Sequence, residues 1–176
     1  VPEAVDENRA LLRSHLPAEP AWLTRVHGTR VLDAATVINA PEADASFTNQ
    51  PGVVCAIMTA DCLPVLLADV DGRVVGAAHA GWRGLAAGVL QRTVAAMRDA
   101  GAGQLLAWLG PAIGPEAFEV GDDVRAAFAH LGPESAQAFR PVANANGKYL
   151  ADLPMLARLA LAEAGVSAVS GEVLPI

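Results

Sequence analysis

The fold of this chain is decided by the segment from Val53 to Arg83, VVCAIMTADCLPVLLADVDGRVVGAAHAGWR. Most of it consists of three apolar runs, each typical of a buried strand. Cys62 follows the first run, Asp71-Gly72 separates the second from the third, and His79 closes the third. A thiol and an imidazole thus lie next to the glycine-containing segment Ala80–Gly84. The pattern predicts a metal site or a nucleophile site at this point.

The second and third runs are expected to form a β-hairpin, because Asp-Gly is a strong signal for a two-residue turn. With Asp71-Gly72 as that turn, Pro64 lies opposite His79, and Cys62 lies opposite Gly81. Diagonal neighbours in such a pair are about 7–8 Å apart at Cα and share a face of the sheet. Cys62 and His79 are therefore predicted to project from the same open end of one hairpin.

A helix is predicted from Leu85 to Ala100, where apolar residues recur at helical spacing and Gly101 supplies a stop. It would begin directly after Trp82-Arg83-Gly84. Free backbone N–H groups at a helix start attract anions, and Arg83 adds a fork of donors. Arg83 is therefore a candidate anion-binding residue.

The rest of the chain supplies further short elements. Strands are expected at residues 22–26 and 30–38, on either side of His27, and residues 40–52 are expected to be a surface loop. A helix is predicted at 6–16, and Asp152 is predicted to cap a helix at 153–164. Helices and strands mix without strict alternation, which indicates an α+β fold with mixed β-sheets.

Composition limits the function classes. A length of 176 residues suits one domain, and no long uncharged apolar run indicates a membrane span. The net charge is −7 and the 12 Lys and Arg residues are scattered, so we expect no nucleic-acid partner. Two cysteines, with no signal peptide at the start of the sequence given, favour a reducing cytoplasm.

From the residues alone, the Cys/His pair admits two interpretations. In the first, His27, Cys62 and His79 bind one metal ion: two imidazoles and a thiolate suit zinc, copper can use the same ligands, and a fourth position stays open for water or substrate. In the second, Cys62 is a nucleophile and His79 its base, as in thiol hydrolases. Asp61, next to Cys62, is in either case a candidate acid/base residue or a turn residue.

Longer motifs add a family resemblance. Val26-His27-Gly28, Thr59–Pro64 (TADCLP), Ala78–Gly84 (AHAGWRG) and Gly110–Gly114 (GPAIG) with Phe118–Gly121 (FEVG) resemble the YfiH-like family, also called the polyphenol oxidase or laccase-domain family. The resemblance runs from about Glu7 to Val166. Its members are described as purine nucleoside phosphorylases.

The resemblance implies a single-domain α/β/β/α sandwich, shared with toxin-type cysteine hydrolases, and a zinc site made by His27, Cys62 and His79. It also implies phosphorolysis of adenosine, inosine and methylthioadenosine, with adenosine deamination as a second activity. Residues 1–176 are expected to form one YfiH-like domain that lacks the N- and C-terminal segments usual in the family.

The leading hypothesis is a zinc-dependent purine nucleoside phosphorylase that binds a purine nucleoside and phosphate. Cys62, His79 and Asp61 would be catalytic, and Arg83 would hold phosphate. The alternatives are a Cys/His thiol hydrolase or deamidase, a copper-dependent polyphenol oxidase, and a metal-binding domain without enzymatic activity.

Overall fold

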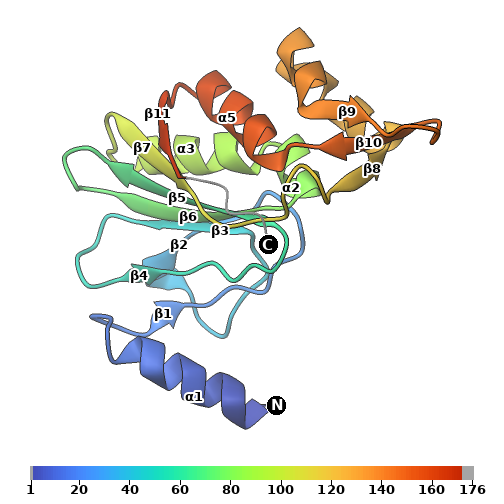
Figure 1. Cartoon of the computed structure of the whole chain (residues 1–176). Coiled ribbons are helices and arrows are strands. Elements are labelled where there is room, and N and C mark those ends of the chain that lie inside the picture. The colour runs from blue at the N-terminus through green and yellow to red at the C-terminus, as the bar shows by residue number, and fades with distance from the viewer. Residues whose placement is uncertain (1, 172–176) are drawn as a thin grey trace.

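The computed structural model describes residues 2–171, and one six-stranded mixed sheet organises the other elements (Figure 1). Its strands lie in the order β11-β7-β5-β6-β3-β2. In chain order they are β2 (Val31–Asp33), β3 (Ala45–Thr48), β5 (Leu63–Asp69), β6 (Val75–Ala80), β7 (Leu105–Leu109) and β11 (Ala168–Ser170). The hairpin β5–β6 occupies the centre of the sheet, with β7 antiparallel to β5 and β3 antiparallel to β6.

Helices cover one face of this sheet, and a thin second β layer lies on the other (Figure 1). The helical layer contains α3 (Val89–Asp99) and α5 (Leu153–Glu163). On the opposite side, β1 (Pro20–Ala21) pairs in parallel with β4 (Val54–Cys55), and α1 (Pro2–Arg13) lies outside that pair. The predicted α+β fold, with α/β/β/α layers in one domain, is confirmed.

The remaining elements lie at one end of the helical layer. A three-stranded antiparallel sheet has the order β8-β10-β9. The elements at this end are α2 (Trp82–Ala86), β8 (Glu119–Gly121), α4 (Asp122–Ala127), β9 (Phe139–Pro141), β10 (Lys148–Ala151) and the 3₁₀ turns Ala129–Leu131 and Pro133–Ala138. A further 3₁₀ turn, Ala34–Thr36, directly follows β2. Across residues 2–171, no helix is both long enough and apolar enough to span a membrane.

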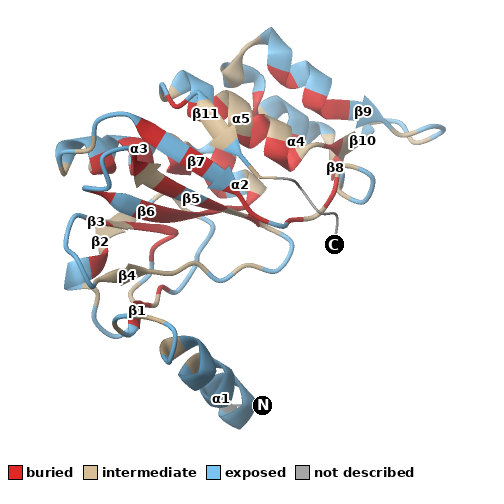
Figure 2. Cartoon of the chain, turned by 60° about the vertical axis from the view of Figure 1, so that its left-hand side comes forward, coloured by how far each residue is buried: buried red, intermediate tan, exposed pale blue. Residues whose placement is uncertain are grey.

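The hydrophobic core lies between the six-stranded sheet and its two covering helices (Figure 2). Leu90, Val94 and Met97 of α3 are at most 1% exposed. A Cβ added to Gly76 of β6 would lie 2.8 Å from the Met97 sulfur, so the helix rests directly on the strand backbone. Each fully buried side chain of this size stabilises the fold by about 1.5–3 kcal/mol. This packing fixes β6, and therefore His79, firmly in the sheet.

The predicted register of the central hairpin is confirmed. Pro64 pairs with His79, and Leu63 pairs with Ala80. The predicted two-residue turn is wrong, because the loop has four residues, 70–73. The Gly72 N–H donates to the Asp69 carbonyl at 2.8 Å, the Asp69 N–H donates to the Val74 carbonyl at 2.9 Å, and Gly72 has a left-handed φ of 72°. A four-residue loop keeps the same register as a two-residue turn. Continuing the register by one residue brings Cys62 opposite Gly81, at the end of the hairpin away from the turn.

The helix predicted at residues 85–100 is two helices. α2 begins at Trp82 and ends at Ala86, and α3 begins at Val89. Gly88 separates them with φ 92°, a left-handed conformation that cannot continue a right-handed helix. Apolar spacing is compatible with a helix on both sides of the break, so the pattern did not reveal it. Arg83 consequently lies inside the first turn of a short helix rather than in front of a long one.

The strands around the hairpin also differ from the prediction. The loop expected at 40–52 contains β3, whose Ser46 and Thr48 are buried polar residues that hid the strand pattern. The run 53–59 forms only the two residues of β4. In the run 22–26, Thr24 makes an isolated bridge to Glu42, and the run 30–38 contains only β2 before a 3₁₀ turn. The predicted first helix starts four residues early, at Pro2.

Candidate metal centre

His27 lies in a tight turn held by one buried carboxylate. The two oxygens of Asp44 accept hydrogen bonds from the N–H groups of Val26 (3.3 Å), His27 (2.9 Å) and Gly28 (2.8 Å). His27 has φ 59°, in the left-handed region that residues other than glycine rarely adopt. The three bonds to Asp44 offset the strain of that conformation and direct the exposed His27 ring toward the end of the hairpin.

His79 is bound to the same carboxylate from the other side. Its Nδ1 donates to Asp44 Oδ1 at 2.9 Å, with both side chains at most 1% exposed. The proton on Nδ1 leaves Nε2 as the free, unprotonated nitrogen. Burial lowers the pKa of His79, against the opposing influence of Asp44, so the neutral ring is favoured. A neutral imidazole oriented by a carboxylate is the form in which histidine binds a metal.

Cys62, the residue directly before β5, is the third candidate ligand beside His27 and His79. Its Sγ lies 3.9 Å from His27 Nε2, and the candidate ligand atoms of His27, Cys62 and His79 all lie within 4.8 Å of one another. Ligands of one tetrahedral zinc ion are about 3.3–3.7 Å apart, so an ion would need to draw these atoms together by about 1 Å. The chemistry of the donors and their convergence fit a zinc ion with an open fourth position.

Gly81 lies in close contact with two of the candidate ligands. A Cβ at this position would lie 2.9 Å from Cys62 Sγ and 3.0 Å from His27 Cδ2. A Cβ on Gly84 would meet the Gly28 carbonyl at 2.8 Å, so α2 also packs against the His27 turn. The glycines of the AHAGWRG motif are therefore required by close contact with the candidate ligands and the turn that carries one of them.

The acidity of Cys62 bears on its chemistry. Burial raises the pKa of this thiol; Arg25 opposes the shift, and Asp61 and Asp44 add to it. A catalytic thiol needs a lowered pKa to be nucleophilic near neutral pH, whereas a bound metal ion deprotonates a thiol directly. The electrostatics of the site therefore favour Cys62 as a metal ligand over Cys62 as an unassisted nucleophile.

The other two predicted site residues lie on the surface. Asp61 is exposed, and its backbone carbonyl accepts from the Ile113 N–H at 2.9 Å. Arg83 is exposed too, and its guanidinium lies 4.4 Å from the centre of the Trp82 ring. Within residues 2–171 no acidic side chain forms an ion pair with Arg83.

Asp44 is the important residue that sequence reasoning missed. The segment 40–52 that contains it is rich in turn-forming residues, so the sequence predicts a surface loop there. In the structure its side chain is completely buried and connects both histidines. The available signal was weak: the flanking alanines, Ala43 and Ala45, are also fully buried, and two small apolar neighbours are compatible with an interior position.

Comparisons with known proteins agree with these motifs. A family model described as multi-copper polyphenol oxidoreductase laccase matches residues 1–174. A purine nucleoside phosphorylase of Pseudomonas aeruginosa is 53% identical over 172 residues, which cover 97% of this chain and 69% of the relative. Purine nucleoside phosphorylase YfiH of Escherichia coli is 51% identical over 173 residues, covering 97% of this chain and 70% of the relative.

Solved structures show the same relationship. The crystal structure of a Neisseria meningitidis protein superposes with a TM-score of 0.91 at 49% identity, covering 99% of this chain and 72% of that one. The YfiH protein of Bacillus licheniformis gives a TM-score of 0.78 at 27% identity, covering 88% of this chain and 63% of that one. From the family match and these identities, the chain belongs to the YfiH-like family of laccase-domain proteins.

Proposed function

We propose that this protein is a zinc-dependent purine nucleoside phosphorylase, with zinc held by His27, Cys62 and His79. The observation that carries the proposal is the convergence of these three ligand atoms within 4.8 Å, in a chain about half identical to relatives named purine nucleoside phosphorylases. The substrates proposed are adenosine, inosine and methylthioadenosine with phosphate, and the second activity proposed is adenosine deamination.

Zinc bound here would act as a Lewis acid and lower the pKa of a bound water toward neutrality, which is the chemistry that deamination requires. The residues of the chain supply the remaining functions. Asp44 keeps His79 in the tautomer that presents Nε2. Asp61, exposed next to Cys62, is proposed to exchange a proton with the substrate. Arg83, free of ion pairs within the described chain, is proposed to contact phosphate.

The second candidate is a thiol hydrolase or deamidase in which Cys62, His79 and Asp44 form a triad. The Asp44–His79 hydrogen bond favours it, because the same bond orients the base in such enzymes. The raised pKa of Cys62 and the position of His27 in the same group favour the metal interpretation. Copper would use the same ligands, but one three-residue group supports a multicopper oxidase poorly.

One experiment distinguishes these functions. Bound metal is measured first, and release of adenine from adenosine is then assayed with and without phosphate on the wild type, His27→Ala and His27→Asn. Asparagine tolerates the left-handed φ of this position, so the second variant preserves the turn. We expect both variants to lose metal and phosphate-dependent base release together, while His15→Ala, an exposed histidine outside the site, retains both.

The alternatives predict other results. A thiol hydrolase keeps its activity after chelation and loses it on alkylation of Cys62. A metal-binding domain without enzymatic activity loses thermal stability on chelation and releases no base from any nucleoside. Full metal content with phosphate-dependent turnover in both His27 variants would show that the site assignment is wrong.

A further inference from the structure

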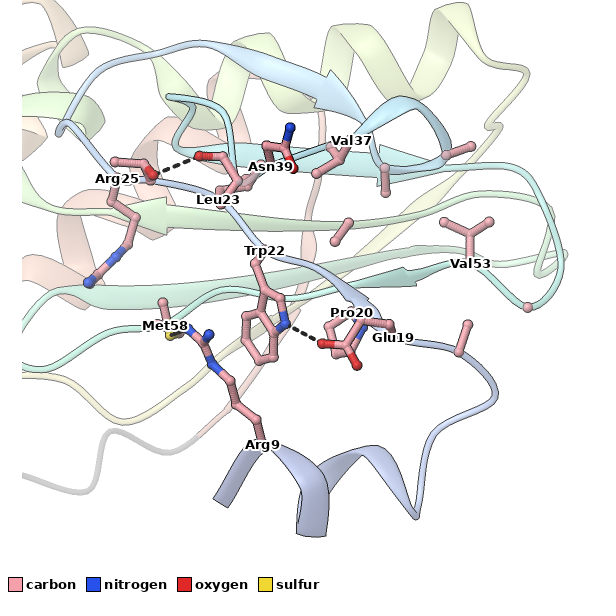
Figure 3. A pocket seen from close by; sticks show the side chains of 17 residues that line it. Arg9, Glu19, Pro20, Trp22, Leu23, Arg25, Val37, Asn39, Val53 and Met58 are labelled. Carbon is pink, nitrogen blue, oxygen red and sulfur yellow. Dashed lines mark hydrogen bonds between the residues drawn. The ribbon is translucent and has the colours of Figure 1, made fainter. Parts of the chain in front are cut away.

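A cavity lies along the segment 18–25, which leads to His27 (Figure 3). Its volume is about 770 Å³, within the range of about 300–1,000 Å³ typical of small-molecule sites. Apolar and aromatic side chains form much of the wall, including Trp22, Val37 and Met58. Arg25, two residues before His27, also lines it, so this cavity reaches the segment that carries a candidate metal ligand.

The backbone on both sides of Arg25 is fixed. Before it, the Thr24 N–H donates to the Pro41 carbonyl at 3.0 Å, and the Thr24 carbonyl accepts from the Ala43 N–H at 3.1 Å. After it, the N–H groups of Val26 and the next two residues bind Asp44. The position of the Arg25 Cα relative to the metal centre is therefore set by the same contacts that position His27.

The Arg25 side chain is available to a ligand. It is exposed, and within residues 2–171 no acidic side chain forms an ion pair with it. Figure 3 shows its guanidinium extending away from the backbone at the opposite end of the cavity from Val53. By contrast, the guanidinium of Arg9, which also lines the cavity, lies 4.6 Å from the centre of the Trp22 ring.

The charge of Arg25 also suits an anion. On a chain with a net charge of −7, a guanidinium two residues before a candidate metal ligand provides local attraction for an anion.

We infer that Arg25 binds the phosphate co-substrate, where the cavity meets the His27 segment. This inference rests on the proposed phosphorylase function and adds a second arginine to the anion site. Arg83 is on α2 and Arg25 precedes His27, so the two guanidinium groups come from different segments next to the metal centre. A planar fork of N–H donors suits phosphate oxygens, and the contact would act on phosphate binding rather than on the metal.

The test compares phosphate saturation of adenosine phosphorolysis in the wild type, Arg25→Gln and Arg25→Lys. We expect Arg25→Gln to raise the KM for phosphate by about tenfold or more, with kcat and bound metal little changed, because charge-assisted hydrogen bonds are the stronger class. Arg25→Lys should recover part of the loss, since it restores the charge without the fork. Arg92→Gln, an exposed arginine of α3, removes the same charge elsewhere and should leave the KM unchanged.

An unchanged KM for phosphate in Arg25→Gln would overturn the inference while leaving the phosphorylase proposal intact. A loss of bound metal that Arg25→Lys does not restore would also overturn it, by assigning Arg25 a structural role. If the wild type shows no phosphorolysis, the proposed function fails. Calorimetric titration of inorganic phosphate into the metal-loaded proteins then decides: weaker binding by Arg25→Gln supports the inference, and equal binding refutes it.

Discussion

A buried aspartate lies at each end of the central hairpin, but the two carboxylates have different roles. Near the turn, the buried carboxylate of Asp69 accepts from Arg73 Nε at 2.9 Å and from the Gly103 N–H at 2.8 Å. At the open end, the buried carboxylate of Asp44 accepts from His79 Nδ1 and from three backbone N–H groups of the His27 turn. Each carboxylate connects the hairpin to a segment distant in the sequence.

The difference lies in the side chain that each carboxylate binds. Arg73 is 54% exposed and also contacts Asp71, so its bond to Asp69 closes a surface turn. His79 is buried and has a second ring nitrogen, so its bond to Asp44 leaves that nitrogen free for the proposed metal site. A buried aspartate is therefore not a functional signal by itself; it becomes one when its partner has a free ligand atom.

The strongest test of this comparison is Asp44→Asn. Asparagine lacks the negative charge that orients His79. Its NH2 group would also replace one accepting oxygen and would face N–H donors. We expect zinc affinity to fall by about 10–100-fold, as for other carboxylates behind a metal-binding histidine. Competition with a chelator of known affinity measures the effect.

The matched variant at the turn is Asp69→Asn. It should leave zinc affinity within about twofold of the wild type, because none of its partners is a ligand, while the melting temperature falls by about 2–4 °C. If Asp69→Asn lost as much zinc affinity as Asp44→Asn, a structural change at the turn would be altering the candidate metal site at the other end of the hairpin. The comparison between the two carboxylates would then fail.

A second pair of variants adds a methyl group at each end. In Gly81→Ala the new Cβ would lie 2.9 Å from Cys62 Sγ, and overpacking of this kind costs about 1–3 kcal/mol. We expect zinc affinity to fall by about 3–10-fold, since part of that strain is relieved by moving the ligands.

In Gly103→Ala the new Cβ would lie 3.1 Å from Arg73 Nη2, the far end of a flexible and half-exposed side chain. The arginine can move aside, so zinc affinity should be unchanged and unfolding in urea should shift little. If the two alanine variants behaved alike, close contact at Gly81 would not be a property of the binding site.

The smallest expected effect is on acid stability of the metal-free protein. Burial alone would raise the pKa of Asp44, but its hydrogen bonds to His79 and to the backbone lower it below the ordinary value of 3.8. The unfolded chain therefore binds the proton more readily, and this contribution is present above pH 3.8 and lost as the pH falls through the folded pKa. The free energy of unfolding, measured in urea from about pH 5 to about pH 2.5, should show a shallower decline for Asp44→Asn. An equal slope in both proteins would remove Asp44 from the acid transition.

The sequence was sufficient for the features that depend on local geometry. The Asp-Gly signal gives the position of the turn, and the four-residue loop at 70–73 keeps the register of the predicted two-residue turn, so the pairing of Pro64 with His79 follows from local sequence. The predicted cap is also present, since Asp152 accepts from the Met155 N–H at 2.8 Å. Both predictions required only residues close together in the chain.

The features that the sequence did not reveal depend on distant partners. Asp44 has the sequence context of a turn residue, and its importance comes from His79, 35 positions away. The strand β3 was missed because its identity comes from pairing with β6 and not from an alternating pattern of its own. Likewise, Gly88 interrupts a helical pattern without changing it, because the apolar residues on both sides face the same core.

The carboxylate of Asp44 also ties metal binding to folding. His27 and Cys62 are 35 positions apart, as are Asp44 and His79, so in an unfolded chain the ligands are separated by long flexible loops. Closing those loops is entropically unfavourable, and folding brings the ligands together before any ion binds. An ion therefore binds the folded chain more tightly than the unfolded chain. Because an ion that binds mainly the folded chain stabilises it by mass action, zinc at 100 times its Kd would add about 2.7 kcal/mol to the free energy of unfolding. Zinc supply would then determine part of the stability of the folded chain as well as the proposed activity.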